Sequence, residues 1–284
     1  MSPVSSELSL DLGHLTLAAR AYGPADGVPM LALHGWLDNA DSFVRLAPRL
    51  EGLRIVALDL AGHGCSGHRP PGGDYHLSGY VEDVLGVADR LGWQRFGLLG
   101  HSLGAVIAVQ LAGALPERVD RLALIDGVLP PVAHEQEAAS RLGMALQACL
   151  RRQPGRKRVY ASFEEGVRAR MNGQVPVSHD AAERLALRGL EPVQEGFSWR
   201  SDSRLTLPSP VRLTQGQALS FVQRIACPTQ LIVATDGLLA HEHDLLAQLP
   251  FEQVTLPGGH HLHLNDELGA SLVADCFNRF LRFA

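Results

Sequence analysis

Short apolar runs alternate with longer segments of helical periodicity along most of this chain. Each apolar run ends in a polar residue or a glycine, as the buried strands of a sheet do. Strands are predicted at residues 8–12, 14–22, 29–33, 54–58, 95–99, 121–125, 229–234 and 251–256. Helices are predicted at 42–50, at 78–91 with Ser78 as N-cap, at 103–115 and at 266–283. This alternation is typical of an α/β fold, in which helices cover a mostly parallel sheet.

The first two predicted strands differ from the rest because almost no residues separate them. Residues 14–22 alternate apolar and polar positions, and Leu12-Gly13 offers a two-residue connection. We therefore expect an antiparallel hairpin at one edge of the sheet.

The pattern changes after Asp126. Amphipathic stretches rich in Arg and Ala follow, interrupted by prolines and without a clear strand, until strand-like patterning returns at 229–234. We therefore predict one domain formed by residues 1–126 and 218–284, with residues 127–217 as a helical insertion.

Composition and charge narrow the function classes. The chain of 284 residues is 46% hydrophobic and carries a formal charge of −5, so it lacks the basic excess that nucleic acids or anionic membranes select. No apolar run reaches the length of a membrane span, and the first residues lack the pattern of a signal peptide. The four cysteines form no C-x-x-C pair. These features predict a cytoplasmic protein with reduced thiols and a small-molecule partner.

The segment Gly100-His101-Ser102-Leu103-Gly104 carries the first candidate chemistry. It places G-x-S-x-G between a predicted strand and a predicted helix, which is the context in which that motif carries a nucleophilic serine. Glycines two positions before and after Ser102 relieve crowding at such a sharp turn. The backbone N–H of Leu103, at the helix start, would face the reacting carbonyl group.

With this segment, the chain resembles α/β-hydrolases along nearly its whole length. His34-Gly35-Trp36 resembles the oxyanion-hole turn of that family, with the Trp36 N–H as the second donor. Residues 59–66, Asp-Leu-Ala-Gly-His-Gly-Cys-Ser, resemble its D-x-x-G-H-G-x-S turn, which we interpret as structural. The resemblance implies an α/β-hydrolase fold: an eight-stranded, mostly parallel sheet, helices on both faces and a helical cap inserted after strand six. It also implies a catalytic triad that needs no cofactor.

A serine nucleophile needs a base and a carboxylate, which follow it in the order acid, then histidine, in this fold. The resemblance aligns the base with His260 in the cluster Gly258-Gly259-His260-His261-Leu262-His263, ahead of His261. For the acid we prefer Asp236, after the predicted strand 229–234, with Asp126, after strand 121–125, as the alternative. His241 and His243 also lie nearby in sequence, but no cysteine or carboxylate spacing completes a metal site, so none is predicted.

These residues predict a serine hydrolase that transfers an acyl group from a carboxylic ester, thioester or lactone to water. Residues 196–210 and 259–263 are similar to the serine hydrolase-like branch of the family, which carries no defined natural substrate. Two alternatives stay open. One is hydrolysis of a carbon–carbon bond by the same triad, and the other is a non-catalytic binding protein on the hydrolase scaffold.

Overall fold

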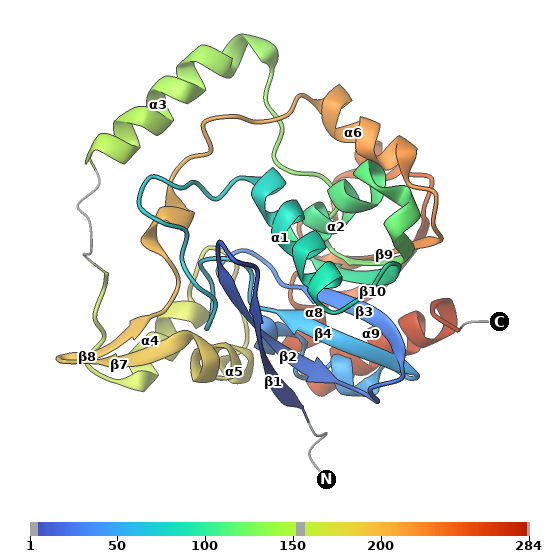
Figure 1. The fold of residues 1–284 in the computed structure, drawn as a ribbon, viewed down its shortest axis with the longest axis horizontal. Helices are drawn as coiled ribbons and strands as arrows, with labels where there is room; N and C mark the ends of the chain where they lie inside the picture. Colours follow the sequence, from blue (N-terminus) through green and yellow to red (C-terminus); the bar gives the residue numbers. More distant parts are fainter. Residues whose placement is uncertain (1–4, 152–156, 283–284) are drawn as a thin grey trace.

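The centre of the molecule is an eight-stranded sheet with the order β1-β2-β4-β3-β5-β6-β9-β10 (Figure 1). The computed structural model describes residues 5–151 and 157–282, so parts of the predicted core and insertion at 1–4, 152–156 and 283–284 lie outside it. The strands are β1 Ser6–Asp11, β2 Thr16–Tyr22, β3 Val28–Leu33, β4 Leu53–Leu58, β5 Phe96–His101, β6 Val119–Ile125, β9 Thr229–Asp236 and β10 Glu252–Gly259. Only β1 with β2 and β2 with β4 pair antiparallel within this sheet, which confirms the predicted fold class.

The hairpin between β1 and β2 is confirmed, although its turn lies one residue later than predicted. The Leu12 N–H donates to the carbonyl oxygen of Leu15 at 2.9 Å, so Gly13 and His14 form the turn. Gly13 has a φ of 84°, a conformation that favours glycine.

Helices cover both faces of the sheet because successive strand residues point to opposite sides. In β3, Leu31 and Leu33 pack on one face and Met30 and Ala32 on the other. The first face is covered by α1 Leu77–Arg90, α2 Leu103–Ala114 and α6 Gln215–Arg224. The second face is covered by α9 Glu267–Phe280 together with α8 Leu262–Asn265. The predicted final helix thus ends at Phe280, before residue 283.

The helix predicted at 42–50 is wrong. Two 3₁₀ turns, Ala40–Phe43 and Ala47–Arg49, occupy this segment. Pro48 explains the break, because in a continuous helix its ring would clash with a carbonyl of the preceding turn. The start of α1 also differs: its N-cap is His76, and Ser78 lies within the first turn.

The segment between β6 and β9 holds α3 Ala138–Arg151, α4 Phe163–Met171 and α5 His179–Gly189. It also contains an antiparallel hairpin, β7 Leu190–Val193 and β8 Gly196–Trp199, so the prediction of an insertion without strands is wrong. Gly196, with a φ of 142°, permits its turn. Smaller elements are α7 His243–Leu246 and the 3₁₀ turns Pro116–Arg118, Glu135–Glu137 and Ser203–Thr206.

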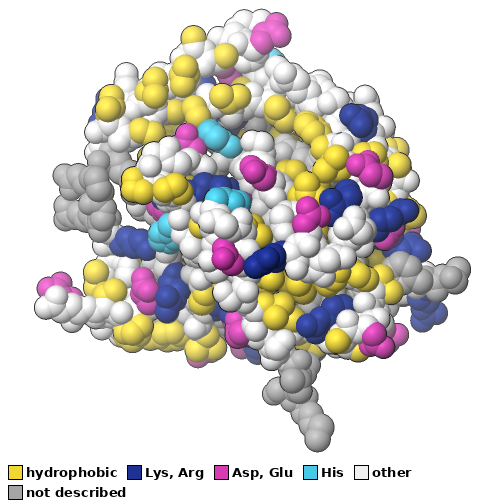
Figure 2. Space-filling model, in the orientation of Figure 1, with side chains coloured by type: hydrophobic (Ala, Val, Ile, Leu, Met, Phe, Trp, Pro, Cys, Tyr) yellow, Lys and Arg dark blue, Asp and Glu magenta, His cyan; other side chains and the backbone are white. Residues whose placement is uncertain are grey.

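The helix α3 extends away from the sheet (Figure 1). Leu142, Leu146 and Leu150 on it are exposed, and hydrophobic side chains gather over this part of the surface, at the upper left of Figure 2. On the same face, acidic and basic side chains are interspersed. In the described ranges, every helix is too short or too polar to cross a membrane.

Candidate active site

Ser102 occupies a sharp turn between β5 and α2. Its φ of 52° and ψ of −116° lie outside the regions that non-glycine residues favour. A Cβ atom at Gly100 would lie 2.5 Å from the Cα of Ala105, and one at Gly104 would lie 1.9 Å from the carbonyl oxygen of Leu33. The crowding expected around this turn is therefore present, and only glycine fits at both positions.

His260 lies in the turn that follows β10, and its ring contacts the side chain of Asp126. The Nδ1 atom of His260 is 2.6 Å from Oδ2 of Asp126, and both residues are buried. Because a carboxylate only accepts hydrogen bonds, we assign the proton of the neutral ring to Nδ1. This assignment leaves Nε2 of His260 unprotonated and able to take up a proton.

The carboxylate of Asp126 is held beneath the turn that follows β9. Its Oδ2 accepts a hydrogen bond from the Leu238 N–H at 2.7 Å, and its Oδ1 accepts one from the Ala234 N–H at 3.3 Å. A Cβ atom at Gly237 would lie 2.3 Å from Oδ2 of Asp126. The side chain of Asp126, which directly follows β6, therefore fills the space at the end of β9, and Gly237 leaves room for it.

The structure does not bring Asp236, the preferred acid, to His260. Asp236, the last residue of β9, is exposed, and its Oδ2 accepts a hydrogen bond from the hydroxyl of Thr235 at 3.0 Å. The exposed end of β9 directs this carboxylate to solvent, whereas Asp126 reaches inward to His260. The structure therefore brings the alternative acid, and not the preferred one, to the histidine.

Three turns at the carboxyl ends of the parallel strands contact one another. The Ser102 N–H donates to the carbonyl oxygen of Ile125 at 3.1 Å. A Cβ atom at Gly127 would lie 2.7 Å from the carbonyl oxygen of Ser102. His101 packs its ring on that of His260, with centroids 4.6 Å apart. These contacts place the turns that carry Ser102, Asp126 and His260 side by side.

The two predicted oxyanion donors are the backbone N–H groups of Leu103 and Trp36. Leu103 is the first residue of α2, where an N–H has no partner within the helix. Trp36 lies in the turn after β3, which closes through a hydrogen bond of 3.1 Å from the Asp38 N–H to the carbonyl oxygen of Gly35. Within residues 5–151 and 157–282, neither the Trp36 N–H nor the Leu103 N–H donates to another protein group.

The turn at 59–66 holds the insertion against the sheet. The buried carboxylate of Asp59 accepts hydrogen bonds from the N–H groups of Ala40 and Cys65, both at 2.7 Å. It also pairs with Arg188 of α5, whose Nε lies 2.8 Å from Oδ2. These contacts agree with the structural interpretation of this motif.

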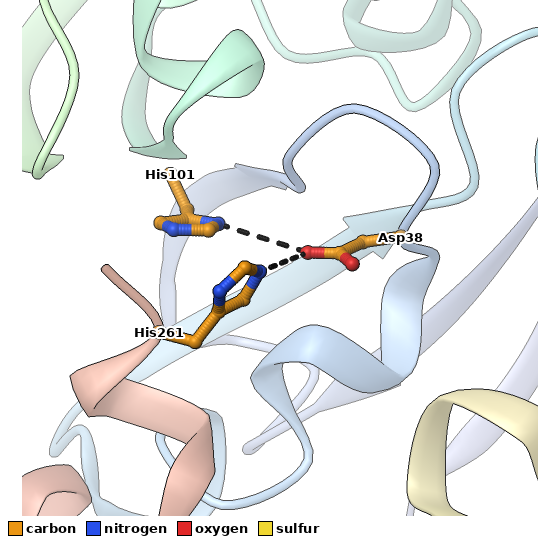
Figure 3. Close-up of side chains that lie close together, drawn as sticks. All are labelled: Asp38, His101 and His261. Carbon is orange, nitrogen blue, oxygen red and sulfur yellow. Dashed lines mark hydrogen bonds and ion pairs between the residues drawn. The ribbon is translucent and has the colours of Figure 1, made fainter. Parts of the chain in front are cut away.

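His261 directly follows His260 but contacts a different carboxylate. Its Nε2 lies 3.0 Å from Oδ2 of Asp38, and Arg170 of α4 donates to the other oxygen of Asp38 at 2.7 Å. Figure 3 shows the rings of His101 and His261 converging on Asp38. Sequence spacing carried no signal for this group, because its members come from the turns after β3 and β10, from the last position of β5 and from the insertion.

The pKa values of this group reflect burial and charge. Burial opposes ionisation of Asp38, but Arg170 and His261 outweigh it and hold the pKa of Asp38 well below its ordinary value. Burial lowers the pKa of His261 and lowers that of His101 further. Asp38 is therefore a carboxylate beside two neutral imidazoles.

The sequence of this chain is similar to those of known proteins. The family model of the alpha/beta hydrolase fold matches residues 28–267. A serine hydrolase-like protein of Dictyostelium discoideum is 31% identical over 92% of this chain and 78% of its own length.

Solved structures give a consistent result. The crystal structure of a hypothetical protein from Pseudomonas aeruginosa PAO1 is 57% identical, with a TM-score of 0.95 over 96% of this chain and 98% of that chain. The thioesterase domain from the curacin biosynthetic pathway is 26% identical, with a TM-score of 0.83 over 96% of this chain and 99% of that domain.

Proposed function

This chain belongs to the α/β-hydrolase family and to its serine hydrolase-like branch, and from that premise we propose that it hydrolyses a small carboxylic ester or thioester. Ser102 is the nucleophile, His260 the base and Asp126 the acid. The observation that carries the proposal is the 2.6 Å contact between Nδ1 of His260 and Asp126, beside the strained turn of Ser102. Asp126 replaces Asp236 in this triad.

Acylation begins when Nε2 of His260 takes the hydroxyl proton of Ser102, whose oxygen attacks the carbonyl carbon of the substrate. The Asp126 carboxylate stabilises the imidazolium that forms. The N–H groups of Trp36 and Leu103 donate to the oxyanion of the tetrahedral intermediate. His260 then returns the proton to the leaving alcohol or thiol, and the acyl group remains on Ser102.

Deacylation repeats these steps with water. His260 removes a proton from a water molecule, which attacks the acyl-enzyme, and the same N–H groups stabilise the second oxyanion. The proton then passes to Ser102, and the carboxylic acid is released. Neither acylation nor deacylation requires a cofactor, because each proton that His260 accepts is passed on within the same step.

We assign residues 127–217 as a cap that limits which acyl groups reach Ser102. Three contacts support this role. Arg170 and Arg188 bind carboxylates of the turns after β3 and β4, and the Trp36 indole donates to the carbonyl oxygen of Leu205 at 3.0 Å. The cap is thus attached directly to the turn that carries one oxyanion donor.

Two arginines of the cap, Arg200 and Arg204, are not available to bind an anionic acyl group. Arg200 pairs with Glu191 at 3.0 Å, and Arg204 pairs with Asp202 at 2.6 Å. Both guanidinium groups are therefore already engaged with carboxylates. The structural similarity to a thioesterase domain supports the inclusion of thioesters among the candidate substrates.

A fluorophosphonate probe tests the nucleophile. We expect it to label the wild-type chain and not Ser102→Ala, while Ser220→Ala, at an exposed serine of α6, labels normally. Equal labelling of Ser102→Ala would refute the proposal. For an active chain, p-nitrophenyl esters and thioesters of matched acyl length then determine the bond that is cleaved. Cleavage of a carbon–carbon substrate, with neither ester nor thioester hydrolysed, would overturn the acyl-transfer assignment.

A further inference from the structure

We propose that Asp38, His101 and His261 form a binding site for a divalent transition-metal ion such as Zn²⁺. None of these three residues takes part in the hydrolytic steps proposed above. Each residue offers one ligand atom, and these three atoms lie within 4.8 Å of one another in the interior (Figure 3). The Asp38 and His101 side chains are fully buried, and that of His261 is 4% exposed.

His101 carries the proposal because one of its nitrogens has no partner. Its Nε2 lies 2.9 Å from the carbonyl oxygen of His260, so Nε2 bears the proton of the neutral ring. Its Nδ1 is then a lone pair, buried and without a hydrogen bond in the described part of the chain. That lone pair lies 3.9 Å from Oδ2 of Asp38, with no proton between them. Metal-binding histidines in proteins have this arrangement, one ring N–H to a carbonyl and the other nitrogen to the ion.

The distances between the donor atoms suit a small divalent ion. Zn²⁺ binds imidazole nitrogen and carboxylate oxygen at about 2.0–2.2 Å, which separates two donors by about 3.3 Å in a tetrahedral site. Oδ2 of Asp38 is 3.0 Å from Nε2 of His261 and 3.9 Å from Nδ1 of His101, which brackets this separation. Two imidazoles and one carboxylate form a donor set typical of Zn²⁺ and Co²⁺.

Gly35 keeps space open beside two of the ligands. A Cβ atom there would lie 3.0 Å from Nδ1 of His101 and 3.2 Å from Oδ2 of Asp38. A larger residue would therefore crowd the position between these two atoms.

Arg170 competes with the metal ion for Asp38. Its Nη2 lies 2.7 Å from Oδ1 of Asp38 and 3.2 Å from Nε2 of His261, so its charge would repel a cation bound between them. Arg170 is the outermost member of the group, with a side chain 12% exposed. Binding of the metal therefore requires Nη2 of Arg170 to move away from Asp38, whereas Nη1 can keep its 3.1 Å hydrogen bond to the carbonyl oxygen of Val175. The His261 proton moves from Nε2 to Nδ1, so that Nε2 can bind the ion.

Metal binding would also affect hydrolysis, and this consequence rests on the proposed function. His101 precedes Ser102 in the chain, and His261 follows His260. A metal ion that fixes both neighbours restricts the nucleophile and the base, so we expect bound Zn²⁺ to inhibit the hydrolase.

Co²⁺ absorption spectroscopy on the full, untagged chain tests the site without an activity assay. We expect one equivalent of Co²⁺ to produce a visible band that Zn²⁺ abolishes. Asp38→Asn and His261→Gln should weaken binding by at least about tenfold. Arg170→Gln should strengthen it by about tenfold or more, because the repelling charge is gone. A misfolded variant cannot produce that gain.

A matched control separates this site from surface histidines. The double variant His241→Gln/His243→Gln removes two exposed rings and should leave the Co²⁺ band unchanged. The proposal is overturned if that control abolishes the band, if Asp38→Asn and His261→Gln leave it intact, or if neither wild type nor Arg170→Gln produces one. Failure of the fluorophosphonate probe would instead overturn the proposed function and leave the metal result standing.

Discussion

His260 and His261 are adjacent in the chain, yet each contacts a different buried aspartate through a different ring nitrogen. His260 uses Nδ1 toward Asp126 at 2.6 Å, and His261 uses Nε2 toward Asp38 at 3.0 Å. The first arrangement keeps Nε2 available for proton transfer, whereas the second commits Nε2 and buries an unpartnered Nδ1. The orientation of the ring therefore distinguishes a candidate base from its neighbour.

The two aspartates also differ in what holds them. Asp126 accepts hydrogen bonds from the N–H of Ala234 in β9 and from the N–H of Leu238 in the turn after it, so its position depends on the sheet. Asp38 instead pairs with Arg170 from α4, so its position depends on the insertion. We infer that the Asp126 pair serves the chemistry and the Asp38 pair links the cap to the core.

Asp126→Asn should have the largest effect on catalysis, and so it best distinguishes the Asp126–His260 pair from the Asp38–Arg170 pair. An amide at this position can donate to Nδ1 and so favour the wrong ring tautomer of His260. By analogy with other triads, we expect kcat to fall by about ten-thousandfold. Steady-state hydrolysis of a p-nitrophenyl ester measures the loss, and circular dichroism checks the fold. A variant that folds and retains most of its kcat would exclude Asp126 as the acid.

The strand pattern, the turn of Ser102 and the position of His260 could be predicted because they are local in sequence. The choice between Asp126 and Asp236 could not. Both follow a strand, and only the packing of β6 beneath the turn after β9, with Gly237 leaving room, decides which carboxylate faces His260. The contact of Arg170 with Asp38 joins residues 132 positions apart through the fold of the insertion, where sequence pattern is weakest.

Acid should destabilise the molecule through three buried histidine rings outside these two pairs. Burial lowers the pKa of His34 to about 4 and that of His63 and His263 to about 3. Below about pH 6.5 the unfolded chain therefore binds more protons than the folded one. Their contribution to stability is complete above that pH and is lost as the pH falls toward 4. Each ring lowers the free energy of unfolding by up to about 1.4 kcal/mol for each unit by which the pH falls.

Urea unfolding between about pH 7.5 and about pH 5.5 measures this slope. His263→Gln should reduce the total change in the free energy of unfolding over this interval by about 1.4 kcal/mol, which is an average slope of about 0.7 kcal/mol per pH unit. His134→Gln, at an exposed histidine, is the matched control and should leave it unchanged. Equal slopes in all three proteins would show that the buried rings do not govern the acid response.

Asp38→Asn should lower the free energy of unfolding. Its effect on kcat should be much smaller than that of Asp126→Asn. Arg170 would then be partly buried without its counterion, at a cost of about 3 kcal/mol in the free energy of unfolding. The double variant Asp38→Asn/Arg170→Gln removes that charge and should recover part of the stability. Urea unfolding of the four proteins of this cycle gives the coupling energy. A coupling near zero would mean that the ion pair does not attach the cap.

Asp236→Asn should have the smallest effect of all. The Asp236 carboxylate is exposed and hydrogen bonds to Thr235, so its neutralisation should change the free energy of unfolding by less than about 0.5 kcal/mol. We expect kcat to stay within about twofold of wild type in the ester assay used for Asp126→Asn. The two variants make the same chemical change at neighbouring strand ends, so each controls for the other. If Asp236→Asn instead lost activity on the scale expected for Asp126→Asn, the acid would be the carboxylate at the end of β9. The turn after β10 would then have to move His260 away from Asp126 during catalysis.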